Sequence, residues 1–261
     1  ILKVAAAQLG PIALDEPRSS AVGRMIALLQ NAKAQGAELV IFPELALTTF
    51  FPRWYTEDQS EIDKYFETEM PNKDTEPLFA EARKLKIGFN FGFAELVVEK
   101  RVTRHFNTAI IVDQQGRIAA KYRKIHLPGH TENEPWRAFQ HLEKRYFEKG
   151  NLGFQVHQVF GGKIGMCICN DRRWPETFRV MGLQGVELVA LGYNTPAHYP
   201  MAPEHDHLQD FHNHLVLQAA AYQNGTWIVG VAKAGREENC DLIGGTCIIA
   251  PTGEIVAECK T

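Results

Sequence analysis

Short runs of consecutive apolar residues recur along the chain and are separated by polar or helically patterned segments. Runs of this kind are too short for helices and are typical of strands buried in a sheet. They lie at residues 2–8, 39–42, 87–96, 106–112, 117–122, 154–160, 163–169, 187–191, 226–232, 246–250 and 254–258. Because helical segments lie between many of them, the pattern predicts an α/β protein, with one sheet buried on both faces or two sheets packed between helix layers.

Four segments carry the three-to-four-residue apolar spacing of helices. Within residues 19–35, Val22, Ile26 and Leu29 form one stripe, and Gly36 ends the segment. The other predicted helices lie at residues 75–85, 174–183 and 206–222. The order strand, helix, strand over residues 2–42 predicts a right-handed parallel crossover.

Two long segments show neither pattern. Residues 50–66 are rich in aromatic side chains, and residues 124–153 are polar with many His and Glu. Loops of that length inside a compact domain are usually functional. No linker, low-complexity tract or internal repeat divides the chain, so we expect a single domain over residues 1–261.

Composition narrows the classes of function. The chain has 261 residues, 45% hydrophobic and 23% charged, and its net charge of −3 gives no indication of a nucleic-acid or membrane partner. No apolar run reaches the roughly 18 residues needed to cross a bilayer, and no N-terminal segment has signal-peptide anatomy. Five cysteines form no disulfide framework. These features predict a reduced, cytoplasmic protein.

Cys169 lies where an apolar strand ends and a polar loop begins. Four polar residues follow the strand at 170–173, and Trp174-Pro175-Glu176 then resembles a helix start. In α/β proteins ligands bind at that edge of the sheet, where a thiol is well placed to be a nucleophile. The alternative is a small buried core residue, the usual role of a free cysteine.

Glu44 and Lys124 follow predicted strands in the same way as Cys169. Each has an ordinary alternative, since Glu44 can cap a loop and Lys124 can be a solvated cation. Together the three types suit covalent catalysis: a carboxylate takes the thiol proton during attack, and an ammonium stabilises the thiolate and the oxyanion. The backbone N–H of Asn170 can be a second oxyanion donor.

The segments Phe42-Pro43-Glu44, Lys124-Ile125-His126-Leu127 and Cys169-Asn170-Asp171-Arg172 resemble the Glu, Lys and Cys motifs of the nitrilase superfamily of carbon–nitrogen hydrolases. The resemblance runs from the first predicted strand to the last. It implies a four-layer α-β-β-α sandwich with Glu44 as general base, Lys124 as oxyanion stabiliser and Cys169 as nucleophile. It also implies that Glu143, in the long polar loop, is a second carboxylate of the site.

Residues 43–54, 139–147 and 169–176 are similar to N-carbamoyl-D-amino-acid amidohydrolases. This similarity implies hydrolysis of an N-carbamoyl-D-amino acid to the D-amino acid, carbon dioxide and ammonia through a carbamoyl-cysteine, with no cofactor. It also implies a homo-oligomer, a dimer or a tetramer. Members of that family continue beyond Thr261 with elements that help subunits pair, so we expect the C-terminal end to be incomplete.

Arg172 and Arg173 follow the predicted nucleophile almost directly. Two guanidiniums there suit a substrate carboxylate, which arginine can bind through two parallel hydrogen bonds. The alternative is pairing with Asp171, Glu176 or another carboxylate. The resemblance implies that Arg172, Arg173 and His141 hold the substrate carboxylate. It also places Asn170, Asn194 and Thr195 around the substrate, and the D preference rests on it alone.

Other chemistry-bearing residues are interpreted as structural. Cys167 and Cys169 are two apart, but the spacing matches no usual zinc pattern, so we predict no metal site. Five histidines near a predicted helix start are interpreted as capping, packing or interface residues. These are His198, His205, His207, His212 and His214.

Two alternative functions stay open. One is another nitrilase-type hydrolase acting on β-ureido acids or simple amides. The other is a catalytically silent homologue serving as a binding or scaffold protein, which would be expected to lack one of the three reactive groups. All three groups are present in this chain.

Overall fold

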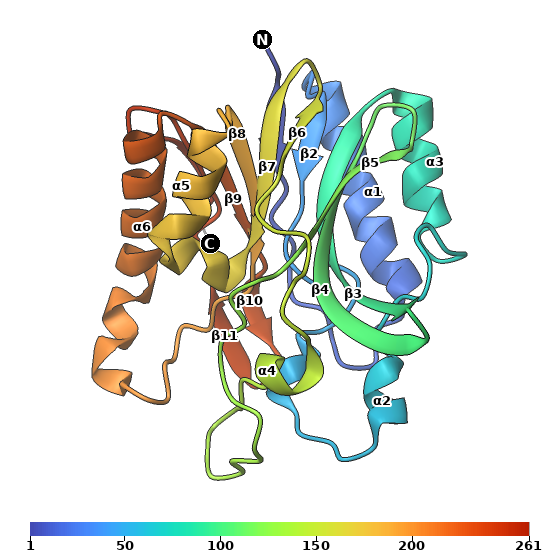
Figure 1. Cartoon of the computed structure of the whole chain (residues 1–261), viewed down its shortest axis with the longest axis vertical. Helices are drawn as coiled ribbons and strands as arrows, with labels where there is room; N and C mark the ends of the chain where they lie inside the picture. Colours follow the sequence, from blue (N-terminus) through green and yellow to red (C-terminus); the bar gives the residue numbers. More distant parts are fainter. Residues whose placement is uncertain (261) are drawn as a thin grey trace.

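Two β-sheets pack face to face between two layers of helices in the computed structural model, which describes residues 1–260 (Figure 1). The first sheet has the strand order β1-β2-β3-β4-β5, and the second has the order β13-β12-β9-β8-β7-β6. Helices α1 and α3 cover one outer face, and α5 and α6 cover the other (Figure 1). The four-layer α-β-β-α sandwich implied by the sequence is therefore confirmed.

The first sheet contains β1 (Val4–Ala6), β2 (Leu39–Ile41), β3 (Gly88–Glu99), β4 (Val102–Val112) and β5 (Ile118–Arg123). Strands β1, β2 and β3 are parallel, whereas β3, β4 and β5 form an antiparallel meander. Helix α1 (Arg18–Ala34) makes the predicted crossover between β1 and β2, and α3 (Glu76–Leu85) precedes β3. A short helix, α2 (Gln59–Asp63), lies within the aromatic segment.

The second sheet contains β6 (Val156–Val159), β7 (Gly162–Ile168), β8 (Leu188–Tyr193), β9 (Trp227–Ala232), β12 (Cys247–Ile249) and β13 (Ile255–Glu258). Strands β7, β8 and β9 are parallel, β6 and β12 are antiparallel to them, and β13 is antiparallel to β12. Helices α5 (Pro175–Leu183) and α6 (Gln209–Asn224) follow β7 and β8. Strands β10 (Ala234–Glu237) and β11 (Cys240–Ile243) form a separate hairpin.

The strands appear in the sequence as continuous apolar runs because both faces of each main sheet are covered. On β2, Leu39 and Ile41 belong to the core between the sheets, whereas Val40 packs into the core beneath α1 and α3. Alternate side chains of a strand point to opposite faces, so a strand buried on both sides has few polar positions. Most polar site residues therefore lie where these strands end, with Asn107 inside β4 as an exception.

Several element boundaries differ from those predicted. Strands β3 and β4 extend to a tight turn at Lys100 and Arg101, which have left-handed φ angles of 52° and 68°. Turns of this kind favour Gly or Asn, so the sequence carried no signal for it. The predicted helix at 206–222 begins instead at Gln209, after a 3-10 turn over Pro203–Leu208. The hairpin of β10 and β11 was not predicted.

Two glycines hold the Glu44 backbone between the sheets. A Cβ atom on Gly192 of β8 would lie 2.4 Å from the Glu44 nitrogen, and one on Gly92 of β3 would lie 2.8 Å from the Glu44 Cα. Two backbone hydrogen bonds also hold this loop. The Gly92 nitrogen donates to the Pro43 oxygen (3.1 Å), and the Ala46 nitrogen donates to the Gly92 oxygen (2.8 Å). The loop after β2 is thus fixed from both sides, with Glu44 at its centre.

We expect the Gly192→Ala variant to be destabilised by about 1–3 kcal/mol, because the new methyl group must displace the Glu44 backbone. Its activity should also fall, since Glu44 would shift. Denaturant unfolding and initial rates measure both effects. Gly23→Ala in α1 is the matched control, because its Cβ would contact nothing within 4 Å. That variant should be more stable by roughly 0.5–1 kcal/mol. Equal stability of the two variants would contradict the packing argument.

Candidate active site

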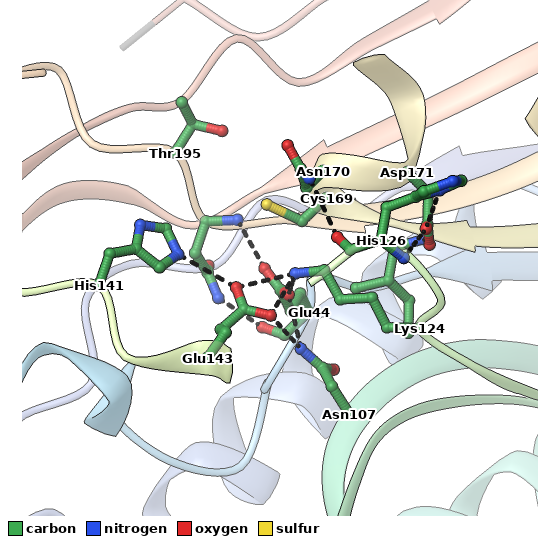
Figure 2. A network of polar contacts seen from close by, with 12 residues as sticks. Glu44, Asn107, Lys124, His126, His141, Glu143, Cys169, Asn170, Asp171 and Thr195 are labelled. Atoms are coloured by element: carbon green, nitrogen blue, oxygen red, sulfur yellow. Dashed lines mark hydrogen bonds and ion pairs between the residues drawn. The ribbon is translucent and has the colours of Figure 1, made fainter. Parts of the chain in front are cut away.

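Three side chains from the ends of different strands meet between the two sheets. Glu44 follows β2, Lys124 follows β5 and Cys169 follows β7, and all three are buried. The Lys124 Nζ lies 2.7 Å from Glu44 Oε1, and Figure 2 shows the Cys169 sulfur directed into the space beside this pair. The structure thus brings together the three residues that the sequence placed at strand ends.

Glu143 joins this cluster from the long polar loop. The short helix α4 (Glu143–Tyr146) turns its carboxylate inward, and the side chain is fully buried. Lys124 Nζ donates to Glu143 Oε1 at 2.8 Å and to Oε2 at 2.6 Å (Figure 2). One buried ammonium therefore lies between two carboxylates, which supply the opposite charge that a buried cation needs.

Further hydrogen bonds fix both carboxylates. Asn107 of β4 donates from Nδ2 to Glu44 Oε1 (2.8 Å), and the backbone nitrogen of Asn194 donates to Glu44 Oε2 (3.2 Å). The Asn194 side chain donates to the Glu44 carbonyl oxygen (2.9 Å). His141 Nε2 lies 3.2 Å from Glu143 Oε1. Asn107 was missed by the sequence analysis because it lies inside an otherwise apolar strand.

The two carboxylates differ in their proton affinity. Burial raises the pKa of Glu44, with a further rise from the charge of Glu143, against the lowering effect of Lys124. Burial opposes ionisation of Glu143 too, but Lys124 and His141 hold the pKa of Glu143 below its ordinary value. Although burial alone would lower it, the charges of Cys169, Glu143 and Glu44 raise the pKa of Lys124. Lys124 is thus paired with both carboxylates, and Glu44 is the one whose pKa is raised.

Cys169 forms a sharp bend between strand and helix. Its φ angle of 46° is left-handed, a conformation that costs a non-glycine residue of the order of 1–3 kcal/mol. Burial and the Glu44 charge raise the pKa of the Cys169 thiol, whereas Lys124 and Arg172 lower it. The resting thiol is therefore protonated at neutral pH, and a base would have to take its proton for it to act as a nucleophile.

A cavity of about 510 Å³ opens onto Cys169. All six predicted substrate residues lie in its wall; they are His141, Asn170, Arg172, Arg173, Asn194 and Thr195. Arg137 also lines it, as do four further histidines, His130, His198, His205 and His212. Among the residues described, the cavity wall contains no Asp or Glu. Three of these histidines, which the sequence analysis interpreted as capping, packing or interface residues, thus lie in the cavity wall, where His198 also packs edge-on against Phe139.

The two adjacent arginines have different surroundings. Arg172 is buried and donates to Asn213 Oδ1 (2.9 Å), to the Cys169 carbonyl oxygen (2.7 Å) and to Thr195 Oγ1 (2.7 Å). It pairs with neither Asp171 nor Glu176, the alternatives raised by the sequence; Asp171 instead receives hydrogen bonds from Tyr122 and His126. Arg173 is more exposed and faces the cavity.

A family model described as carbon-nitrogen hydrolase matches residues 3–261. The chain belongs to the carbon-nitrogen hydrolase family. N-carbamoylputrescine amidase from Arabidopsis thaliana is 31% identical to this hydrolase, over 88% of the present chain and 74% of the relative. A citrullinase from Francisella tularensis is 26% identical, over 98% of this chain and 84% of the relative.

Solved structures share the fold of this carbon-nitrogen hydrolase. A carbon-nitrogen hydrolase from Helicobacter pylori superposes with a TM-score of 0.83 at 22% identity, over 99% of this chain and 85% of the other. An amidase from Nesterenkonia sp., solved with acrylamide added at its active-site cysteine, superposes with a TM-score of 0.77 at 21% identity, over 99% and 89% of the two chains. At these identities the likeness concerns the fold.

The structure supplies no site for a metal in residues 1–260, where no three His, Cys, Asp or Glu side chains are grouped to hold one. None of the helices over the same residues is both long and apolar enough for a membrane span.

We expect Glu143→Gln to move the acid limb of the kcat/KM profile of this hydrolase to lower pH. The negative charge of Glu143 raises the pKa of Glu44, so removing that charge lowers it. If Glu44 is the base, activity is lost as pH falls through its pKa, and a lower pKa shifts that loss downward. Glu148→Gln, on a carboxylate that pairs with Arg104, is the control and should leave the limb in place. A shift to higher pH would refute the assignment.

Proposed function

We propose that this enzyme hydrolyses N-carbamoyl-D-amino acids to the D-amino acid, carbon dioxide and ammonia, with Cys169 as nucleophile. Membership of the carbon-nitrogen hydrolase family supports the reaction class. The buried cluster of Glu44, Lys124 and Glu143 beside Cys169 supports covalent catalysis. Nucleophile, base and oxyanion donors all come from the chain, so the proposed reaction needs no cofactor.

The proposed choice of substrate rests on the charge of the cavity wall. Three arginines and five histidines line it, and its described residues include no carboxylate. Arg137 is paired with Glu134 and His198 with Asp206, so the attraction for a substrate carboxylate rests mainly on Arg172 and Arg173. Arg173 is the group most free to bind that carboxylate, since Arg172 is occupied by Cys169, Thr195 and Asn213. Hydrogen bonds to a charged group contribute roughly 1.5–3 kcal/mol each.

The first chemical step forms a bond between the Cys169 sulfur and the ureido carbonyl carbon. Glu44 takes the thiol proton, which its raised pKa suits it to hold. The oxyanion is stabilised by Lys124 Nζ and by the backbone N–H of Asn170. As the tetrahedral intermediate collapses, the bond from carbonyl carbon to the amino-acid nitrogen breaks, and Glu44 returns the proton to that leaving amine.

The second step removes the carbamoyl group from sulfur. Water enters the position left by the amino acid, Glu44 accepts one of its protons, and the oxygen attacks the thioester carbon. The carbon–sulfur bond then breaks, and the thiol regains its proton from Glu44. The released carbamic acid decomposes to carbon dioxide and ammonia. Glu143 keeps the charge of Lys124 balanced through both steps, because its pKa is held low.

A second candidate substrate is an N-carbamoyl amine, because an N-carbamoylputrescine amidase is 31% identical to this chain. The cavity wall argues against it, since the ammonium of such a substrate would face Arg172 and Arg173, whereas of the three arginines in that wall only Arg137 is paired with a carboxylate among the described residues. Ammonia release from matched N-carbamoyl amino acids and N-carbamoyl amines distinguishes the two. Chiral analysis of products from a racemic N-carbamoyl amino acid tests the D preference, which rests on the sequence similarity around residues 43–54, 139–147 and 169–176.

We expect Cys169→Ala to abolish turnover while still binding the substrate, because the cavity and its arginines stay in place. Isothermal titration with an N-carbamoyl-D-amino acid measures the binding, and ammonia release measures the turnover. Residual turnover at the wild-type rate would exclude Cys169 as nucleophile. Cys240→Ala, at a buried thiol away from the cluster, is the control.

We expect Arg173→Ala to raise KM for carboxylated substrates by about tenfold or more, with a smaller effect on kcat and none on neutral amides. The reason is that Arg173 would contact the carboxylate and not the reacting carbonyl. Arg179→Ala, on an exposed arginine of α5 whose side chain bonds to the Gln223 oxygen, is the matched control. An unchanged KM for carboxylated substrates in Arg173→Ala would show that Arg173 does not bind them.

A further inference from the structure

Asp171 is a buried carboxylate that the proposed chemistry does not use. It lies two residues after Cys169 and is completely inaccessible to solvent. No lysine or arginine forms an ion pair with it among the described residues. A buried charge without such a partner is costly unless hydrogen bonds satisfy it, so the contacts of Asp171 need an explanation.

Both oxygens of Asp171 are occupied by groups from two separate segments. Oδ1 accepts from the backbone nitrogen of His126 (2.9 Å) and lies 3.0 Å from His126 Nδ1. Oδ2 accepts from the Tyr122 hydroxyl (2.8 Å) and from the backbone nitrogen of Ile168 (2.9 Å). These four contacts satisfy the carboxylate without a lysine or arginine partner.

The positions of these donors are what matters for the site. Tyr122 and His126 lie two residues before and two residues after Lys124, and Ile168 lies one residue before Cys169. Asp171 therefore joins the segment that carries the ammonium to the bend that carries the thiol. Asn170 adds a second link, because its Nδ2 donates to the His126 carbonyl oxygen (3.0 Å) (Figure 2).

The bend itself is held from two sides. The Ile168 nitrogen, just before the bend, donates to Asp171 Oδ2, just after it. Arg172 Nη1 donates to the Cys169 carbonyl oxygen (2.7 Å). These contacts oppose relaxation of the left-handed φ angle at Cys169. Hydrogen bonding to Asp171 also keeps Tyr122 a donor, since burial and the Asp171 charge raise the pKa of its hydroxyl well above the ordinary value.

We propose that Asp171 is a positioning residue that holds the Lys124 segment against the Cys169 bend, and so sets the placement of the ammonium relative to the thiol. It acts through Tyr122, His126 and Ile168 and touches no reacting atom. The inference rests on the proposed function only in taking Cys169 and Lys124 as the reacting pair. A misplacement of about 1 Å in such a pair can lower the rate roughly 10²-fold.

The direction of one pKa change separates positioning from a direct charge effect. Lys124 lowers the pKa of the Cys169 thiol, with Arg172 acting in the same sense and Glu44 and Glu143 in the opposite sense. If Asp171→Asn releases Lys124 from its place, the apparent pKa of the thiol rises and its alkylation slows. If Asp171 acted only as a nearby negative charge, removing that charge would lower the pKa and speed alkylation.

The experiment follows alkylation of Cys169 by iodoacetamide against pH, with the modified peptide quantified by mass spectrometry. This readout needs no substrate, so it stands even if the enzyme turns out not to hydrolyse N-carbamoyl-D-amino acids. The partly exposed thiol of Cys259 reports general changes in reactivity in the same sample. Steady-state kinetics then measures kcat and KM on an accepted substrate.

For Asp171→Asn we expect slower alkylation of Cys169 with a raised apparent pKa, unchanged alkylation of Cys259, and a kcat at least about tenfold lower with little change in KM. Glu67→Gln is the matched control for a purely structural effect. Glu67 is also a buried carboxylate, but it bonds to Arg18 and Asn72, which belong neither to the Lys124 segment nor to the Cys169 bend. That variant should be less stable and yet keep the wild-type pKa of Cys169.

Milder variants keep the proposal testable if Asp171→Asn fails to fold. Tyr122→Phe removes one donor to Asp171 and should shift the Cys169 pKa in the same direction by a smaller amount. His126→Ala should shift it too, whereas His126→Asn, which keeps a donor near the position of Nδ1, should restore most of the wild-type value. Folded Asp171→Asn or Tyr122→Phe protein with a wild-type or lowered Cys169 pKa would overturn the proposal.

Discussion

The buried ammonium of Lys124 is the interaction on which the rest of the site depends. It is completely inaccessible to solvent and is neutralised by Glu44 at 2.7 Å and by Glu143 at 2.6 and 2.8 Å. One cation shared by two carboxylates leaves the cluster with an excess negative charge. That excess distinguishes the two acids: Glu143 stays ionised beside Lys124 and His141, while the pKa of Glu44 rises.

The same electrostatics keep the thiol of Cys169, the proposed nucleophile, protonated at rest. Burial and Glu44 raise the pKa of Cys169 more than Lys124 and Arg172 lower it. A thiol of this kind becomes nucleophilic only as its proton leaves, so its reactivity depends on the placement of a base. The fold provides that placement in two ways. Close packing against two glycines fixes the Glu44 backbone, and Asp171 joins the segment that carries Lys124 to the bend that carries Cys169.

Much of this arrangement could be predicted from the sequence, and the reason is simple. Strands buried on both faces tolerate few polar side chains, so the first polar residues after them mark the edge of the sheet, where Glu44, Lys124 and Cys169 lie. The layer order followed from the family resemblance. Asn107 carried no such signal, because its partner Glu44 is brought to it only by the packing of the loop after β2.

Hydrogen-bond partners were the least predictable part. Arg172 lines the cavity, but the sequence carried no signal for its contacts with the Cys169 carbonyl oxygen, Thr195 and Asn213. The five histidines of the cavity wall are scattered between His130 and His212, and nothing in their spacing indicates that they share a surface. Contacts of this kind are set by how distant segments approach, which local pattern does not encode.

Mass spectrometry of the enzyme quenched during turnover of an N-carbamoyl amino acid tests the central claim most directly. The account predicts that the peptide containing Cys169 gains one carbamoyl group, and that this adduct forms and decays at rates consistent with ammonia release. Ammonia release with no adduct on Cys169, or with the carbamoyl group on another residue, would contradict it.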